Sequence, residues 1–188
     1  MKSKILMFLC LFLTVSCYES ERDKISRLVK EWDGKEILFS SNSIFTVQGR
    51  DTVVFDFSHS AYKVVMYSDT VDCISCRLQL SKWKLFIQEV ESLYNKTGDV
   101  SFLFYFHPEN RKELEFIIRR DSFNYPICLD QGDEFYNLNH FPSESTIQTF
   151  LLNQDNKVIA IGNPIHNSKV KDLYLKFLCG EKKELRQE

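Results

Sequence analysis

Apolar and polar positions follow two periods along this chain, and these separate the expected strands from the expected helices. Two nearly continuous apolar runs, 62–67 (YKVVMY) and 100–106 (VSFLFYF), are typical of strands buried inside a sheet. Between them, apolar residues recur at helical spacing. This spacing predicts one helix whose inner face carries Cys76, Leu80, Trp83, Ile87, Val90 and Tyr94.

Further elements are predicted on both sides of this central unit. The ranges 43–47 and 52–57, joined by turn residues, indicate a β-hairpin, and 36–39 is also expected to be extended. Helices are expected over 25–32, from Asn110 or Glu109 to Arg120, and from Asn167 or Ser168 to Gly180. A short strand at 125–129, a helical turn at 134–138 and a terminal hairpin of 148–153 with 157–161 complete the order.

This order of elements favours an α/β fold. Strands separated by helices favour parallel pairing in the middle of a sheet, whereas the terminal hairpin favours an antiparallel edge. We therefore expect a central mixed sheet with helices on both faces, an N-terminal β-hairpin and a short inserted β element. No repeat or Pro/Gly linker interrupts the chain, so one domain is expected over 31–180, followed by a polar tail at 181–188.

Composition narrows the function classes. The 188 residues, 44% hydrophobic and 27% charged, have room for one domain plus an appendage and exclude a wholly disordered chain. The net charge of −2 provides no basic field for phosphate backbones, so no nucleic-acid partner is expected. Sixteen Phe and eight Tyr predict a largely aromatic core.

The first seventeen residues have the pattern of an export signal. Lys2 and Lys4 precede the apolar run 5–13, which as a helix spans only about 14 Å, half of a bilayer core. We expect a signal peptide over 1–16. Ser16 followed by Cys17 resembles the lipobox of bacterial lipoproteins, which implies diacylation (palmitate) of Cys17 and a lipid-anchored tether over 17–30. A plain secretory signal cut elsewhere is the alternative.

With export, the expected location is the cell envelope, lipid-anchored and facing the periplasm or the cell exterior, where disulfides persist. Four cysteines then remain for the folded part, which allows three pairings: Cys73, Cys76, Cys128 and Cys179. Cys128 lies inside an apolar strand and is expected to be a buried small hydrophobe, although a pairing with Cys179 stays open.

The informative spacing is Cys73-Ile-Ser-Cys76, placed where an expected strand gives way to an expected helix. Backbone N–H groups and the helix dipole at such a position stabilise a thiolate on Cys73. Cys76 can then attack a mixed disulfide formed on Cys73 and release a reduced thiol. Arg77 favours the thiolate, whereas Asp72 opposes it.

At these positions the chain resembles the thioredoxin-like superfamily, in particular its exported TlpA-like and ResA-like branch, which is related to the AhpC/TSA redoxins. The resemblance covers about residues 36–178. The stretch 43–67 is similar to the first hairpin and first central strand of that branch, 125–130 (YPICLD) to its inserted strand, and 149–159 (TFLLNQDNKVI) to its terminal hairpin.

The resemblance also has departures. Family members carry a cis-proline opposite the CxxC, and the matching position is Ile147, preceded by Thr146; this pair is the candidate substrate loop, and its peptide bond is expected to be trans. Tyr67 stands at the position of the family's acidic or amide group, and Asp72 at that of the aromatic residue before the first cysteine.

The resemblance implies a thiol–disulfide oxidoreductase in which Cys73 attacks and Cys76 resolves, with no cofactor and no metal. Its implied partners are disulfides or thiols of exported proteins, a membrane electron donor, and the bilayer through Cys17. The alternative is a non-catalytic binding or assembly lipoprotein whose CxxC is a structural disulfide or holds a metal. A peroxiredoxin-like peroxidase, with Thr70 three residues before Cys73, is a minor alternative.

Overall fold

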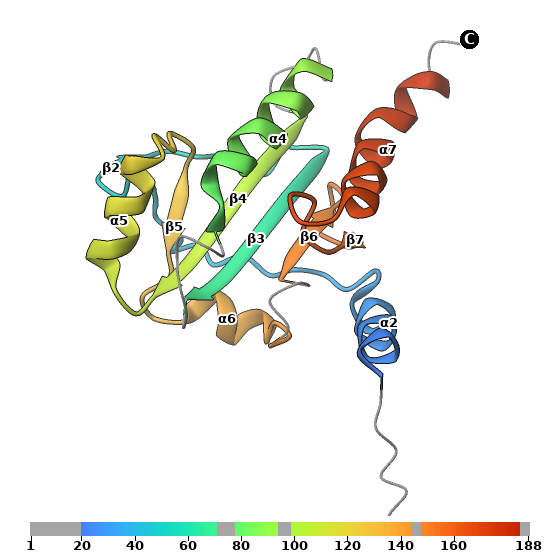
Figure 1. Ribbon diagram of the computed structural model, residues 1–188, viewed down its shortest axis with the longest axis horizontal. Helices are drawn as coiled ribbons and strands as arrows, with labels where there is room; N and C mark the ends of the chain where they lie inside the picture. Colours follow the sequence, from blue (N-terminus) through green and yellow to red (C-terminus); the bar gives the residue numbers. More distant parts are fainter. Residues whose placement is uncertain (1–19, 71–77, 94–98, 144–147, 185–188) are drawn as a thin grey trace, which may run out of the picture.

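One seven-stranded sheet organises the chain. A computed structural model describes residues 20–70, 78–93, 99–143 and 148–184. The strand order is β2-β1-β5-β4-β3-β6-β7 (Figure 1). The strands are β1 (Phe45–Val47), β2 (Asp51–Val53), β3 (Tyr62–Thr70), β4 (Val100–Pro108), β5 (Ile127–Leu129), β6 (Thr149–Leu152) and β7 (Val158–Ile161). The helices are α2 (Glu21–Trp32), α4 (Leu80–Leu93), α5 (Arg111–Arg120), α6 (Glu134–Asn139) and α7 (Ser168–Glu184).

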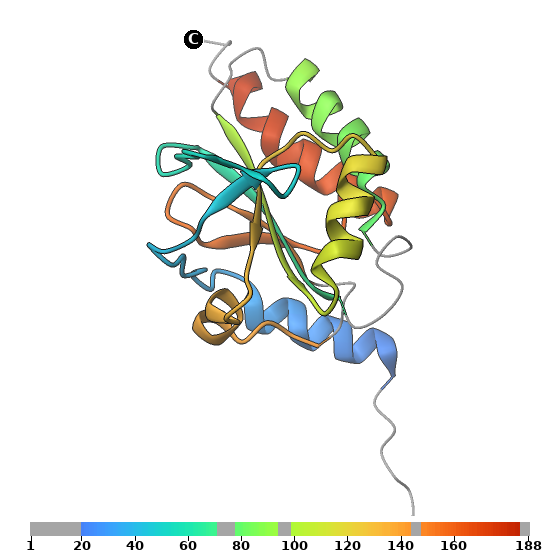
Figure 2. The same ribbon diagram turned by 90° about the vertical axis from the view of Figure 1, so that its left-hand side faces the viewer.

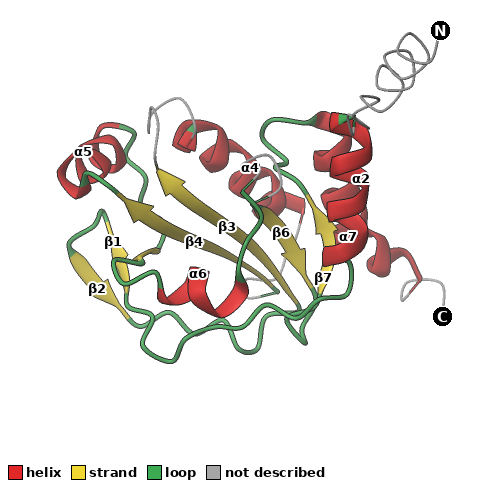
Figure 3. Cartoon of the chain, turned by 90° about the horizontal axis from the view of Figure 1, so that it is seen from below, coloured by secondary structure: helices red, strands yellow, loops and turns green. Residues whose placement is uncertain are grey.

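The sheet is mixed, as the order of elements predicts. β3 pairs with β4 in parallel over their full lengths, and β4 pairs with β5 in parallel. β6 runs antiparallel to both β3 and β7, and β1 is antiparallel to β2 and β5. Because β3, β4 and β7 share one direction, their carboxyl ends meet at one edge of the sheet, which Figure 3 shows for the arrowheads of β3 and β4.

Each face of the sheet carries its own hydrophobic cluster, because successive strand residues point to opposite faces. Val64, Met66 and Phe104 belong to the cluster beneath α4, α5 and α7, which lie together on one side in Figure 2. Val65 and Tyr105 belong to the opposite cluster, to which α2 and α6 contribute aromatic side chains. The predicted helices on both faces are therefore confirmed.

The predicted inner face of the long helix is confirmed where the structure describes it. Leu80, Trp83, Ile87 and Val90 are all buried, and Trp83 is fully enclosed. Two helix starts are also explained by their caps. The Asn110 side chain accepts the amide of Glu113, and the Asn167 side chain accepts the amide of Lys169, so the asparagine is the capping residue in each case.

Some element boundaries differ from the sequence-based expectation. α7 runs through Gly180 to Glu184, so the prediction that Gly180 ends this helix is wrong; continued backbone hydrogen bonding outweighs the low helix propensity of a single glycine. The range 36–39 is not a strand, since only Glu36 forms an isolated bridge, to Lys157. The hairpin strands are three residues each, shorter than predicted.

The predicted tether overlaps a helix. α2 begins at Glu21, where the Ser20 side chain accepts the amide of Asp23, a turn before the expected start at residue 25. Its buried residues, Leu28 and Trp32, join the domain, and the Trp32 ring lies 5.0 Å from Phe150 in β6. The later part of 17–30 is therefore helical. No helix among the described residues is long and apolar enough to cross a membrane.

Candidate functional site

The residues predicted to carry the chemistry fall outside the part of the chain that the structure describes. Cys73 and Cys76 belong to 71–77, Thr146 and Ile147 to 144–147, and Cys17 to 1–19. Their roles therefore stay predictions. The residues that flank these segments are described, and they fix where each segment leaves and rejoins the fold.

The flanks of both internal segments meet at the carboxyl edge of the sheet. β3 ends at Thr70, directly before 71–77. Three residues earlier, the amide of Tyr67 donates to the carbonyl oxygen of Gln148, the residue that follows 144–147, at 3.0 Å. The turn after β7 lies at the same edge, because the amide of Gly162 in this turn donates to the carbonyl oxygen of Thr149, the first residue of β6, at 2.8 Å. The CxxC segment and the expected substrate loop are thus anchored on adjacent strands.

The helical side of the CxxC segment is anchored by core residues. Leu78 is fully buried and helical, but Gln79 has a positive φ of 41°, and α4 proper begins at Leu80. The Gln79 carbonyl oxygen accepts the amide of Lys82 at 2.8 Å. The helix predicted to run unbroken from Cys76 is therefore interrupted at Gln79, because a positive φ does not fit an α-helix.

An aromatic layer lies beneath this edge. The Tyr67 ring stacks on Phe141 at 4.8 Å between centroids and on Tyr136 at 5.9 Å. Burial, followed by the negative charges of Asp69 and Asp133, raises the pKa of Tyr67 well above its ordinary value. The hydroxyl at the position of the family's acidic group is therefore a poor proton acceptor or donor near neutral pH.

Polar groups gather beside Tyr67, on the turn that leads into α6. The Asp130 carboxylate is buried and accepts the amides of Glu134, Phe135 and Tyr136 at 2.9, 3.0 and 3.4 Å, which caps α6. His107, near the end of β4, has its Nδ1 2.6 Å from the carbonyl oxygen of Asp130. The same Nδ1 is 2.9 Å from Oδ1 of Asp133.

The sequence alone predicts no role for this histidine. The signal that was present is positional: His107 directly follows the second buried strand run, and the carboxyl ends of parallel strands meet at one edge. Its carboxylate partner is 26 residues away in the sequence, on a turn with a positive φ of 53° at Asp133, and no spacing rule reveals such a contact.

A groove of about 250 Å³ opens at the same edge of the sheet, between α2 and the turn after β7. Its lining is mainly apolar: Ile25, Val29, Ile161, Gly162, Asn163, His166, Asn167 and Val170. Gly162 has a φ of 112°, and a Cβ there would lie 3.2 Å from a methyl carbon of Val170, so the turn requires glycine. Burial lowers the pKa of His166, and the positive charge of Lys82 lowers it further. Because Lys82 belongs to the first turn of α4, His166 lies near the start of that helix.

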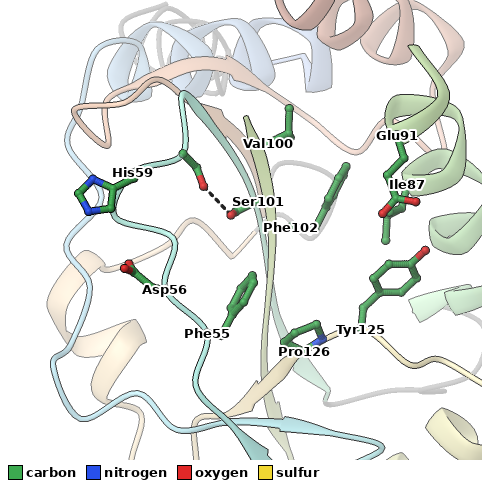
Figure 4. A pocket seen from close by; sticks show the side chains of 11 residues that line it. Phe55, Asp56, His59, Ile87, Glu91, Val100, Ser101, Phe102, Tyr125 and Pro126 are labelled. Atoms are coloured by element: carbon green, nitrogen blue, oxygen red, sulfur yellow. Dashed lines mark hydrogen bonds between the residues drawn. The ribbon is translucent and has the colours of Figure 1, made fainter. Parts of the chain in front are cut away.

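A larger cavity of about 370 Å³ lies at the opposite, amino end of β4 (Figure 4). Phe55, Phe102 and Tyr125 line it beside a buried hydrogen bond of 2.6 Å between the hydroxyls of Ser60 and Ser101. Because Val100 begins β4 whereas the CxxC segment follows the carboxyl end of β3, this cavity is separated from the candidate site by the length of the sheet.

Cys128 behaves as the expected buried hydrophobe. Its side chain is 5% exposed, it is a free thiol, and it belongs to the cluster on the face opposite α7. Burial, followed by the negative charge of Asp130, raises the pKa of this thiol to about 11. A thiol of that kind is a poor nucleophile at neutral pH. Among the described residues, no three His, Cys, Asp or Glu side chains are grouped as metal ligands.

Comparison with known proteins supports the fold. No family model matches the chain, and no curated protein matches it. Among solved structures, the thioredoxin domain of a thiol-disulfide oxidoreductase from Bacteroides vulgatus has a TM-score of 0.52 at 12% identity, covering 75% of this chain and 96% of that one. A thiol-disulfide oxidoreductase from Bacteroides fragilis has a TM-score of 0.50 at 13% identity, covering 74% and 99%.

A third solved structure is a peroxide-reducing protein of the same fold. The bacterioferritin comigratory protein of Xanthomonas campestris, described with alkyl peroxide reduction activity, has a TM-score of 0.50 at 10% identity, covering 78% of this chain and 99% of that one. At these identities the likeness establishes a thioredoxin-like fold. It leaves the chemistry of this chain to be argued from its own residues.

Proposed function

We propose that the protein is an extracytoplasmic thiol–disulfide oxidoreductase that uses the dithiol of Cys73 and Cys76. The observation that carries the proposal is the position of the CxxC in the chain, between the carboxyl end of β3 and the buried start of α4, in a thioredoxin-like sheet. The described fold anchors both ends of the short segment: β3 pairs with two strands, and Leu78 and Leu80 are fully buried.

In the proposed mechanism the Cys73 thiolate attacks a substrate disulfide. One substrate sulfur becomes bonded to Cys73 and the other leaves as a thiolate that takes up a proton. Cys76 then attacks the mixed disulfide, which releases the reduced substrate and leaves Cys73 and Cys76 oxidised to each other. A dithiol donor returns the pair to the reduced state, and a membrane partner fills this role in the expected cell-envelope location.

The apolar groove beside the site supports a protein as the substrate. Ile25 and Val29 of α2, on one side, and Ile161 and Val170, on the other, provide an apolar surface at the edge of the sheet where the CxxC segment is anchored. An extended peptide that carries apolar side chains next to its cystine buries more apolar area there than a small disulfide does.

The export segment supports the cellular context. Residues 1–16, followed by Cys17, favour a lipid-anchored protein of the cell envelope, a compartment in which disulfide exchange has substrates. Mass spectrometry of the mature N-terminus tests the anchor: a diacylated Cys17 is expected, and an unmodified N-terminus elsewhere contradicts it.

The direct test of the function is turnover of a disulfide-bonded protein with dithiothreitol as the electron source. We expect catalysis by the wild type and none by Cys73→Ser. Cys76→Ser is expected to accumulate a mixed disulfide with the substrate, visible as a mass shift that reductant removes. Cys128→Ser is the matched control and retains activity. A wild type that neither turns over nor forms mixed disulfides favours the binding-module alternative.

A further inference from the structure

The cavity of about 370 Å³ at the amino end of β4 is built from separate parts of the chain. The loop between β2 and β3, the last turns of α4, the first residues of β4 and the segment before β5 each line part of it. Figure 4 shows Asp56 and His59 on one side of the β4 ribbon and Glu91 and Tyr125 on the other. The cavity therefore extends around the start of the strand, and its volume suits a small ligand.

The cavity is open because β5 does not cover the start of β4. β5 pairs with β4 only over 104–106, whereas β4 begins at Val100. The residue before β5 is Pro126, which has no N–H to donate to the next position of the ladder. The range 100–103 therefore has no partner in β5, and the space beside it remains as the cavity.

The charged groups of the cavity are mainly carboxylates. The described residues that line it include Asp56 and Glu91, one histidine (His59), and no lysine or arginine. Oδ1 of Asp56 accepts the hydroxyl and the amide of Ser58 at 2.6 and 2.9 Å, and these bonds lower the pKa of Asp56. Within the described parts of the chain, no ion pair neutralises Glu91. A positively charged ligand therefore suits this cavity.

Aromatic rings form much of the apolar wall. Phe55, Phe102 and Tyr125 line the cavity, and Phe102 packs edge-to-face on Phe86 with 6.1 Å between the ring centroids. Burial raises the pKa of Tyr125, and the negative charge of Glu91 raises it further, so this carboxylate lies close to the ring. The face of an aromatic ring attracts a cation. Since no three His, Cys, Asp or Glu side chains of the described chain are grouped as metal ligands, an organic cation fits better than a metal ion.

Two buried hydroxyls in the wall provide a second polar contact. Ser60 is 4% exposed and Ser101 is 8% exposed, and their oxygens are 2.6 Å apart. One hydroxyl donates to the other, so the hydrogen of the second hydroxyl has no acceptor in the hydrogen bonds of the described residues. A buried donor without an acceptor is unfavourable, and an oxygen atom of a ligand removes that cost.

We propose that this cavity binds an organic cation, namely a primary ammonium or guanidinium group on a stem that also carries an amide or hydroxyl oxygen. The carboxylates of Asp56 and Glu91 and the aromatic rings stabilise the cation, and the oxygen accepts the remaining hydrogen of the Ser60–Ser101 pair. A lysine or arginine side chain with its peptide carbonyl has this chemistry, and so does a free amino alcohol. The site is separate from the dithiol and does not depend on the proposed function.

The test is a titration of the isotope-labelled full chain, followed through its backbone amide NMR signals. The probes are Nα-acetyl-lysine methylamide, aminopentanol and, as the uncharged match of the first, Nα-acetyl-norleucine methylamide. We expect saturable shifts at Ser101, Phe102 and Tyr125 with the two charged probes, and a Kd at least about tenfold higher for the norleucine probe. The tighter of the two charged probes identifies the source of the ligand as a peptide or a free amine.

A matched pair of variants assigns the binding to this cavity. Glu91 is exposed, and we expect Glu91→Gln to raise the Kd of the charged probes about threefold to tenfold. Glu89→Gln removes a carboxylate from the same helix, where Glu89 pairs with Lys171, and is expected to leave the Kd unchanged. Equal affinity for the lysine and norleucine probes, or equal effects of the two variants, overturns the inference, as does the absence of saturable shifts. The activity of the dithiol is unaffected by any of these results.

Discussion

The amide of Tyr67 donates to the carbonyl oxygen of Gln148 at 3.0 Å, and this bond joins the strand that leads to the CxxC segment to the residue that follows the expected substrate loop. Tyr67 stands six residues before Cys73, and Gln148 directly follows Thr146 and Ile147. The Gln148 side chain is itself buried and donates to the Pro142 carbonyl oxygen at 2.9 Å. The strand that precedes the dithiol and the strand that follows the expected docking loop are therefore hydrogen-bonded to each other.

The hydrophobic core beneath α4 stabilises the helix that follows the CxxC segment. Trp83 is fully buried and packs edge-to-face on Phe104 at 5.2 Å. We expect Trp83→Ala to lower the free energy of unfolding by about 3–5 kcal/mol because it leaves a large cavity. Leu85→Ala, on the exposed side of the same helix, is the control and is expected to change it by about 0.5 kcal/mol or less. Urea unfolding measures both, and equal effects contradict the assigned core.

The cap of α6 is a second stability determinant, and it is independent of the dithiol. Asp130→Ala leaves three amides of α6 without their acceptor. We expect a loss of about 1–3 kcal/mol in thermal or urea unfolding, because buried amides then lack partners. The exposed neighbour Gln131 is the control, and Gln131→Ala is expected to leave stability unchanged. A neutral result for Asp130→Ala shows that the cap contributes nothing to folding.

Alkaline pH is expected to destabilise the fold. Burial raises the pKa of Cys128 to about 11 from an ordinary value near 9, so the folded state favours the protonated thiol. That contribution is complete below pH 9 and is lost as the pH rises from 9 towards 11. Burial raises the pKa of Tyr105 as well, so its contribution has the same sign at higher pH.

The contribution of Cys128 is separable by mutation. Between pH 9 and 11, one such group lowers the free energy of unfolding by at most about 1.4 kcal/mol per pH unit. Replacing Cys128 with Ala removes this part, so the decline measured by urea unfolding across that window becomes shallower. Curves of identical slope for the wild type and Cys128→Ala indicate that the thiol does not titrate differently in the folded state.

The groove beside α2 is expected to bind protein substrates. Val29→Asp places a charge on its apolar wall, and we expect KM for a disulfide-bonded protein to rise about 5- to 30-fold, equivalent to 1–2 kcal/mol. Turnover of a small disulfide such as oxidised glutathione is expected to stay the same. Val54→Asp, at a fully exposed position after β2, is the control. An equal loss with both substrates indicates a general effect on the fold.

The fold was predictable from sequence because its strongest signals are local. The runs 62–67 and 100–106 and the stripe through Trp83 each specify an element and its buried face, and together they define the central parallel pair. Boundaries were less accurate where single residues decide them. The positive φ of Gln79 interrupts the helix, and Gly180 is tolerated within α7.

The candidate site was only partly predictable for a related reason. A CxxC between a strand and a helix is a local pattern, so sequence alone identifies Cys73 and Cys76 as candidates. The contact between His107 and Asp133 joins β4 to the turn before α6, and it exists only once β5 has joined the sheet. Such a pair is set by topology, which the spacing of residues along the chain does not reveal.

The reduction potential of the Cys73–Cys76 pair tests the central proposal most directly. Equilibration of the full chain with defined ratios of oxidised and reduced dithiothreitol or glutathione, followed by alkylation and mass spectrometry of the two cysteines, gives this value. A redox-active dithiol is expected to lie at roughly −270 to −180 mV, between thioredoxin and protein disulfide isomerase. A bond that stays intact in excess dithiothreitol while the protein is folded, or a reduced pair that no alkylating agent reaches, contradicts the proposal.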